Sequence, residues 1–201
     1  MSLKQNNTTP LSKEAAIELL TPFCAPEDDH RDYLKTVFSF DGLTWATAGH
    51  VIVCVFGEFA PALSGCEGMV YDNLCTSLNS ILNSSPNLFG PPPEIHFKGD
   101  GWLTCKECNG KRVIEFDSDY NNYECTCKSC EGDGGFNIKE QVIIPGMRRY
   151  YDADVLRRLL ALPGVEIGRS DDIVCFRFDY GLAFLSGAEK THTERRLEQF
   201  Q

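Results

Sequence analysis

Two C-x-x-C knuckles constrain the fold of this chain more than any other feature of its sequence. They span residues 105–108 and 127–130, and Gly110 and Gly132 follow them at the same offset. Each C-x-x-C turn presents two sulfurs on one side of a tight bend, and two such turns form the closed tetrahedral shell that zinc favours. The spacing therefore predicts a structural zinc site with four ligands: Cys105, Cys108, Cys127 and Cys130.

One alternative ligand lies close to this set, because Cys125 is two residues upstream of the second knuckle. A cluster without metal is the other alternative, but a glycine-rich polar loop has too few apolar side chains to hold itself together. Four cysteine ligands leave no coordination position for water or substrate. We therefore expect the zinc to be structural rather than catalytic.

The remaining cysteines are predicted to be reduced packing residues. The chain has ten cysteines, and Cys54 and Cys175 sit inside apolar runs, while Cys75 falls on a predicted helix. A free cysteine behaves as a small, readily buried hydrophobe. The first ten residues lack the apolar segment of a secretory signal, and no apolar run reaches about 18 residues. We expect a soluble cytoplasmic protein.

The charge balance disfavours indiscriminate binding to nucleic acid or to anionic membranes. The formal net charge is -10 and the pI is about 4.8, and residues 101–134 contain four Lys or Arg against seven Asp or Glu. The better basic candidates surround Tyr150 and Tyr151 at the start of the third predicted helix. A solvated helix face is the alternative for these candidates, which are Arg148, Arg149, Arg157 and Arg158.

Hydrophobic periodicity predicts three helices and several short strands. Ser12 and Asp152 are candidate N-caps of the first and third helices, and Asp72 is a candidate cap for a second helix that includes Leu78. Asp41-Gly42 between β-rich runs is a hairpin signal, because both central residues need positive φ. The predicted strands are 33–40, 43–47, 50–56, 94–97, 141–144, 165–167, 173–178 and 182–186.

This order predicts an α+β protein with antiparallel sheets. Helix and strands occur in the first half and again in the second half, which indicates an architectural duplication around an inserted zinc ribbon. The predicted divisions are a polar tail (1–11), a first half of the body (12–100), the ribbon (101–134), a second half of the body (135–187) and a charged tail (188–201).

Two short resemblances add to this prediction. The second knuckle matches the C-x-x-C-x-G-x-G repeat of the cysteine-rich domain of J-domain co-chaperones through Gly134, whereas the first has Arg112 in place of the last glycine. Residues 40–50 resemble the strand-turn-strand segment of bacterial DNA polymerase sliding clamps, with Ala48 where those clamps have aspartate. Residues 150–160, with 165–167 after them, are similar to the clamp's second helix and following strands.

The clamp resemblance implies a duplicated clamp-like fold, a connection with DNA replication and a phage or mobile-element source. Three functions follow as expectations. The first is a non-enzymatic, clamp-like accessory protein of DNA metabolism that associates with DNA or replication proteins. The second is a zinc-stapled protein–protein interaction module without a DNA role. The third is an enzyme whose active site is not marked in the sequence, which we expect least because no recognisable nucleophile motif accompanies His50 or His96.

Overall fold

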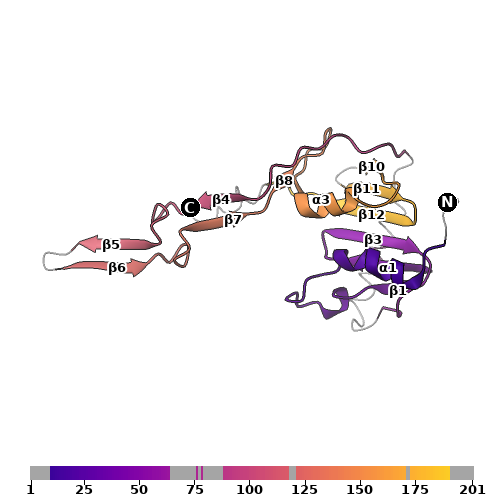
Figure 1. Cartoon of the computed structure of the whole chain (residues 1–201), viewed down its shortest axis with the longest axis horizontal. Coiled ribbons are helices and arrows are strands. Elements are labelled where there is room, and N and C mark those ends of the chain that lie inside the picture. Colours follow the sequence, from indigo (N-terminus) through magenta and orange to yellow (C-terminus); the bar gives the residue numbers. More distant parts are fainter. Residues whose placement is uncertain are drawn as a thin grey trace.

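The computed structural model describes residues 10–63, 76, 78, 88–117, 121–170 and 173–190. They form an α+β body from which a long, narrow arm projects (Figure 1). The described helices of the body are α1 (Lys13–Leu20) and α3 (Ala153–Leu160). Two short 3-10 helices accompany them, at Thr21–Phe23 and Asp32–Leu34.

The body is organised around one antiparallel sheet of six strands in the order β1-β2-β3-β12-β11-β10. Two three-stranded meanders, one from each half of the chain, meet where β3 pairs with β12, from Val51 opposite Leu185 to Val55 opposite Gly181. The predicted antiparallel α+β class is therefore confirmed. The strands are β1 (Phe38–Phe40), β2 (Leu43–Thr47), β3 (Val51–Phe56), β10 (Glu166–Ser170), β11 (Ile173–Phe178) and β12 (Gly181–Ser186).

Both faces of this sheet are buried, because alternate residues of a strand point to opposite sides. In β3, the side chains of Val51, Val53 and Val55 belong to the core cluster that also contains residues of α1 and α3. Cys54 and Cys175 belong to the cluster on the other face. Both helices therefore pack on the same face of the sheet.

The packing role predicted for two cysteines is confirmed. The exposed fractions of Cys54 and Cys175 are 0% and 2%, and burial raises the pKa of each thiol to about 12. Both remain neutral thiols near neutral pH. Cys75 lies outside the described residues, as does most of the second predicted helix. Leu78, which is helical and fully buried, packs on the same face as Cys54.

Local sequence signals account for the element boundaries. Ser12 Oγ accepts from the backbone N–H of Ala15 at 3.2 Å, and Asp152 Oδ1 accepts from that of Val155 at 2.9 Å, so both N-caps are confirmed. Asp41 and Gly42 have φ of 53° and 75° in the turn between β1 and β2, as the hairpin signal predicts.

The predicted strand 141–144 is shorter in the structure, at Gln141–Val142, and two other predicted strands differ more. The segment 33–40 is a strand only from Phe38, because a 3-10 helix occupies Asp32–Leu34. The segment 94–97 has no regular secondary structure, although Ile95 and Phe97 pack against the core. In both segments the apolar side chains alternate because they are buried. The segments are not strands throughout, because they do not form the ladder of backbone hydrogen bonds with a neighbouring strand.

Segments of the same chain cover the outer strands of the sheet. Beside β1, the backbone N–H of Ser39 donates to Pro61 O at 2.7 Å. Beside β10, Gly90 and Ile167 exchange two backbone hydrogen bonds of 3.0 and 2.7 Å. Such coverage reduces the tendency of an exposed edge to pair with another chain.

The arm is a succession of two-stranded ribbons (Figure 1). β4 (Gly101–Thr104) pairs with β7 (Gly135–Ile138), and the more distant β5 (Val113–Asp117) pairs with β6 (Asn122–Thr126). The short strands β8 (Gln141–Val142) and β9 (Tyr151–Asp152) lie where the chain returns to the body.

An ion network attaches the base of the arm to α3. The Arg157 guanidinium bonds to Glu140 and to Asp154, and it lies 4.5 Å from the ring centroid of Phe97. Glu140 in turn accepts from the backbone N–H of Lys98, and its side chain is only 7% exposed. Because this carboxylate is nearly buried, the loss of its partner would cost more than the loss of an exposed ion pair.

We predict that Arg157→Ala loosens the base of the arm. The free energy of unfolding should fall by about 1–2 kcal/mol, since Glu140 would keep its burial without its guanidinium partner. Hydrogen exchange should accelerate at Lys98 and Glu140. Arg158→Ala is the matched control, because Arg158 is exposed and donates to Pro22 O, outside the network at the base of the arm. Equal exchange in both variants would contradict the role of Arg157.

Candidate metal centre

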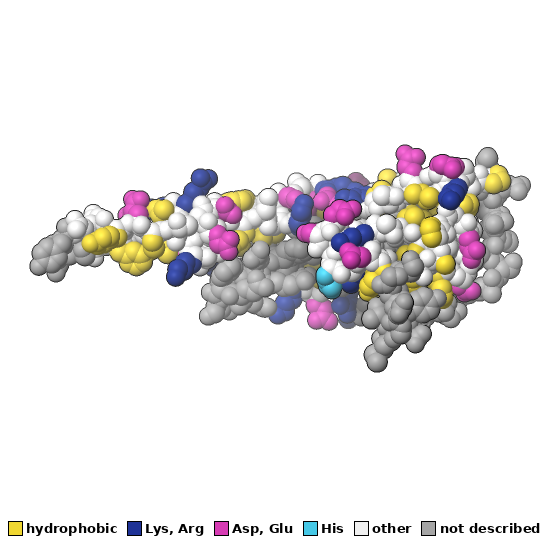
Figure 2. Space-filling view, turned by 90° about the horizontal axis from the view of Figure 1, so that it is seen from below, with side chains coloured by type: hydrophobic (Ala, Val, Ile, Leu, Met, Phe, Trp, Pro, Cys, Tyr) yellow, Lys and Arg dark blue, Asp and Glu magenta, His cyan; other side chains and the backbone are white. Residues whose placement is uncertain are grey.

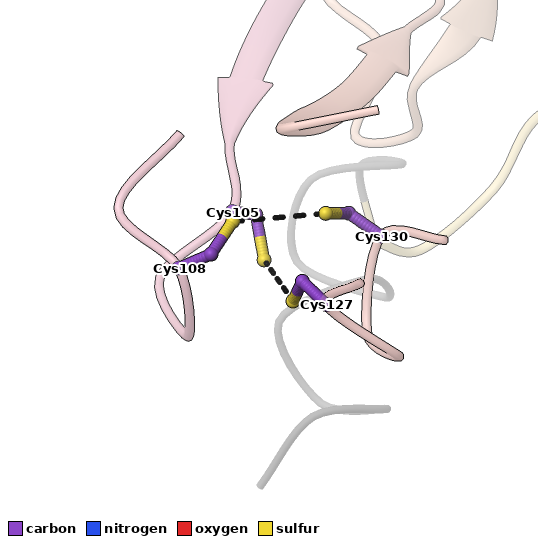
Figure 3. A group of neighbouring side chains, drawn as sticks. All are labelled: Cys105, Cys108, Cys127 and Cys130. Atoms are coloured by element: carbon purple, nitrogen blue, oxygen red, sulfur yellow. Dashed lines mark hydrogen bonds between the residues drawn. The ribbon is translucent and has the colours of Figure 1, made fainter. Parts of the chain in front are cut away.

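The four predicted ligands converge at one point of the arm (Figure 3). Their sulfur atoms all lie within 4.8 Å of one another, and all four residues are buried. The Sγ atoms of Cys105 and Cys127 are 3.8 Å apart, and those of Cys108 and Cys130 are 3.7 Å apart. The first knuckle follows β4 and the second follows β6.

This geometry fits a tetrahedral metal ion. With metal–sulfur bonds of about 2.3 Å, the edge of a regular tetrahedron of sulfurs measures about 3.8 Å. The distances between Cys105 and Cys127 and between Cys108 and Cys130 equal that edge to within about 0.1 Å. The sulfur-only donor set suits a thiophilic ion, and its four members fill the shell. The cluster can therefore hold a metal ion in a closed site.

The two knuckles have the same backbone conformation. After the second cysteine of each, the next two residues have positive φ: Asn109 (49°) and Gly110 (79°) in the first, Glu131 (53°) and Gly132 (89°) in the second. Both glycines are closely covered, since an added Cβ would lie 3.1 and 3.0 Å from the methyl groups of Thr104 and Thr126, respectively.

This equivalence also has a signal in the sequence. Thr104 and Thr126 each precede the first cysteine of a knuckle, so the chain repeats the pattern T-C-K-x-C-x-G. The threonine that packs over each glycine is thus part of the same repeated motif as the cysteines.

Each knuckle also accepts a hydrogen bond from the start of the other. The backbone N–H of Cys105 donates to Gly134 O, and that of Cys127 donates to Arg112 O, both at 2.9 Å. Arg112 occupies the position equivalent to Gly134, and its φ of 74° is left-handed like the 82° of Gly134. The first knuckle therefore keeps the turn of the second at the cost of a strained non-glycine residue.

Backbone amides reach the sulfurs. The N–H of Gly134 donates to Cys130 Sγ at 3.2 Å. Burial opposes ionisation of Cys108, but the N–H groups of Arg112 and Gly110 and the neighbouring thiols lower its pKa to about 7. Burial dominates at Cys127 and raises its pKa to about 12. Four adjacent thiolates need a cation to offset their repulsion, and a bound metal supplies it.

The alternative ligand Cys125 is not part of the cluster. It lies on β6 opposite Ile114 and is exposed to solvent. Ile114 and Phe136 are the partly buried hydrophobic residues that pack against the four cysteines. Apart from the four cysteines, few apolar side chains therefore stabilise this part of the arm.

The four predicted basic residues have different surroundings. Arg157 belongs to the ion network at the base of the arm, and Arg158 contacts the chain after α1. Arg149 donates to Gly187 O at 3.5 Å and lies 3.6 Å from Glu189. Arg148 is exposed. Arg148 and Arg158 are thus the more accessible cations of the set.

The two candidate catalytic histidines are exposed as well. His96 Nε2 lies 3.8 Å from Glu94 Oε1, and both side chains are more than four-fifths exposed. His50 is exposed beside the start of β3, where its backbone carbonyl accepts from Ser186. Neither imidazole is enclosed as a general base usually is.

Fold and site together define an α+β protein with an arm whose four buried cysteines are placed so that they can hold a metal ion. No protein-family model, curated protein or solved structure matches this chain. Among the described helices, none is long and apolar enough to cross a membrane.

We predict opposite effects of two substitutions at the equivalent knuckle positions. Arg112→Gly should strengthen metal binding by about 0.5–1 kcal/mol, because relief of left-handed strain exceeds the extra entropy of glycine in the unfolded chain. Gly134→Ala should weaken it by at least about 2 kcal/mol, since the new Cβ would lie 2.8 Å from Gly110 O. Competition with a chromophoric chelator measures both values, and shifts of the same sign would refute the equivalence.

Proposed function

We propose that this chain is a non-enzymatic accessory protein in which a zinc ion holds together a protein-binding arm. The observation that carries this proposal is the position of the four buried cysteines at the root of the exposed β5–β6 hairpin. A closed four-sulfur shell suits a structural zinc and leaves no position for a substrate. Catalysis at this site is accordingly not part of the proposal.

The metal takes the place of a hydrophobic core in the arm. An isolated two-stranded hairpin is marginal in water, and the buried cluster beneath this one consists of the four cysteines. The hairpin nevertheless exposes Phe116 (53%) and Tyr123 (57%). Aromatic side chains are enriched in protein interfaces, so a rigid arm that exposes them is suited to binding a partner.

We predict about one zinc ion per chain, as one closed four-cysteine shell requires. Cys108→Ser should lose the metal, whereas Cys125→Ser, the matched control outside the cluster, should retain it. Metal analysis by mass spectrometry under native conditions measures both. Protons compete for the thiolates, so zinc should be retained near neutral pH and released as the pH falls.

Removal of zinc by a chelator should raise hydrogen exchange in β5 and β6 and leave β3 and β12 unchanged. A metal-free protein whose proteolysis between Gly101 and Gly134 is unaltered would contradict the structural role of the metal.

A second candidate is a sliding-clamp-like accessory protein of DNA metabolism, of phage or mobile-element origin. The observation that favours it is the order of elements: α1 precedes β1–β3, α3 precedes β10–β12, and both helices lie on one face of the joined sheet. This agrees with the two helix-plus-strands halves that the clamp resemblance implies. The covered outer strands, however, disfavour a ring closed by sheet continuation.

For this candidate we predict salt-dependent association with duplex DNA through the accessible arginines. Replacing Arg148 and Arg158 together by alanine should weaken binding and lower the slope of log affinity against log salt by about 2, one per lost phosphate contact. Lys106→Ala on the arm is the control. Fluorescence anisotropy with a labelled duplex measures the slope, and absence of binding at low salt would remove the DNA role.

A further inference from the structure

The β5–β6 hairpin has one apolar face and one acidic face. Residues directly opposite in an antiparallel pair share a face, and the register places Phe116 opposite Tyr123 and Ile114 opposite Cys125. The alternate pairs on the other face are Glu115 with Glu124, Asp117 with Asn122 and, at the root of the hairpin, Val113 with Thr126. Hydrophobic side chains gather on the outer half of the arm in Figure 2.

The apolar face is held in place by the metal centre. Ile114, at its root, packs against the cysteine cluster. Phe116 and Tyr123 lie beyond it and are more than half exposed. These two aromatic rings form an exposed apolar surface. Its burial against a partner would stabilise the complex by roughly 25 cal/mol per Å² of apolar area.

The outer edge of β6 is open in the described part of the chain, where β5 is the strand that pairs with it. An open edge presents unpaired backbone N–H and C=O groups, to which an extended segment can add as a further strand. Alternate residues of an added strand would fall on the two faces of the hairpin.

The charges on the two faces of the hairpin determine which residue types an added strand would need. Glu115 already pairs with Lys111 at 3.2 Å, whereas Glu124 on β6 has no ion pair within the described residues. A strand added beside β6 would therefore place basic side chains next to Glu124 and apolar side chains next to Tyr123. Nucleic-acid phosphates and a second copy of this acidic face carry the wrong charge for that position.

We propose that the β6 edge binds an extended segment of a partner protein in which apolar and basic residues alternate. This inference rests on the proposed function, because the hairpin needs the metal to be rigid. Backbone hydrogen bonds supply affinity, and the two faces of the hairpin supply specificity.

The test uses the zinc-loaded full chain and two labelled peptides of identical composition. In one peptide lysine and valine alternate, and in the other they form two blocks. The alternating peptide should bind about tenfold more tightly, because only it separates charge and apolar surface onto opposite faces. Tyr123→Ser with Phe116→Ser should cost about tenfold, and Glu124→Lys a similar factor. Trp102 is an exposed aromatic residue of the β4–β7 ribbon, and Trp102→Ser should leave the affinity unchanged.

Equal affinity for the two peptides, or unchanged binding by the double aromatic variant, would overturn the inference. Binding of a single-stranded oligonucleotide through Tyr123, or self-association in sedimentation that Tyr123→Ser abolishes, would overturn the partner class. Zinc content, measured in every variant, separates the two proposals. A wild-type chain without zinc would refute the proposal that zinc holds the arm together. A zinc-loaded arm that binds the two peptides equally would refute only the proposed partner segment.

Discussion

The pairing of β3 with β12 is the interaction on which the rest of the structure depends. It joins Val51–Phe56 to Gly181–Ser186, so the two halves of the chain share one sheet and one pair of buried faces. Gly181 permits the close approach, because a Cβ there would meet Cys54 O at 1.9 Å. The arm lies in the chain between these two strands, which returns to the body before α3, β10 and β11.

A cluster of four buried cysteines and a network of ion pairs hold the arm, which contains few buried apolar side chains. Between its two ribbons, four sulfurs occupy the position that a small core would otherwise fill. At its base, Arg157, Glu140 and Asp154 connect it to α3. Phe116 and Tyr123, on the hairpin beyond the four sulfurs, remain more than half exposed.

Much of the fold and of the site was predictable because the relevant chemistry is local. The caps at Ser12 and Asp152, the turn at Asp41-Gly42 and the two C-x-x-C knuckles each depend on a few neighbouring residues. The strand predicted at 94–97 was wrong for the opposite reason. Its alternation is real burial of Ile95 and Phe97, but a strand also needs a partner elsewhere in the chain.

The sequence by itself determined the four clustered cysteines, the packing cysteines Cys54 and Cys175 and the antiparallel α+β class, since spacing and periodicity constrain these directly. Only the tertiary structure decided that Cys125 stands outside the cluster and that Arg157 bonds to Glu140 at the base of the arm. It also decided that, within the described residues, the strand of Tyr123 pairs with β5 alone. Each of these depends on which distant segments come together, and that is set by the packing of the whole chain rather than by neighbouring residues.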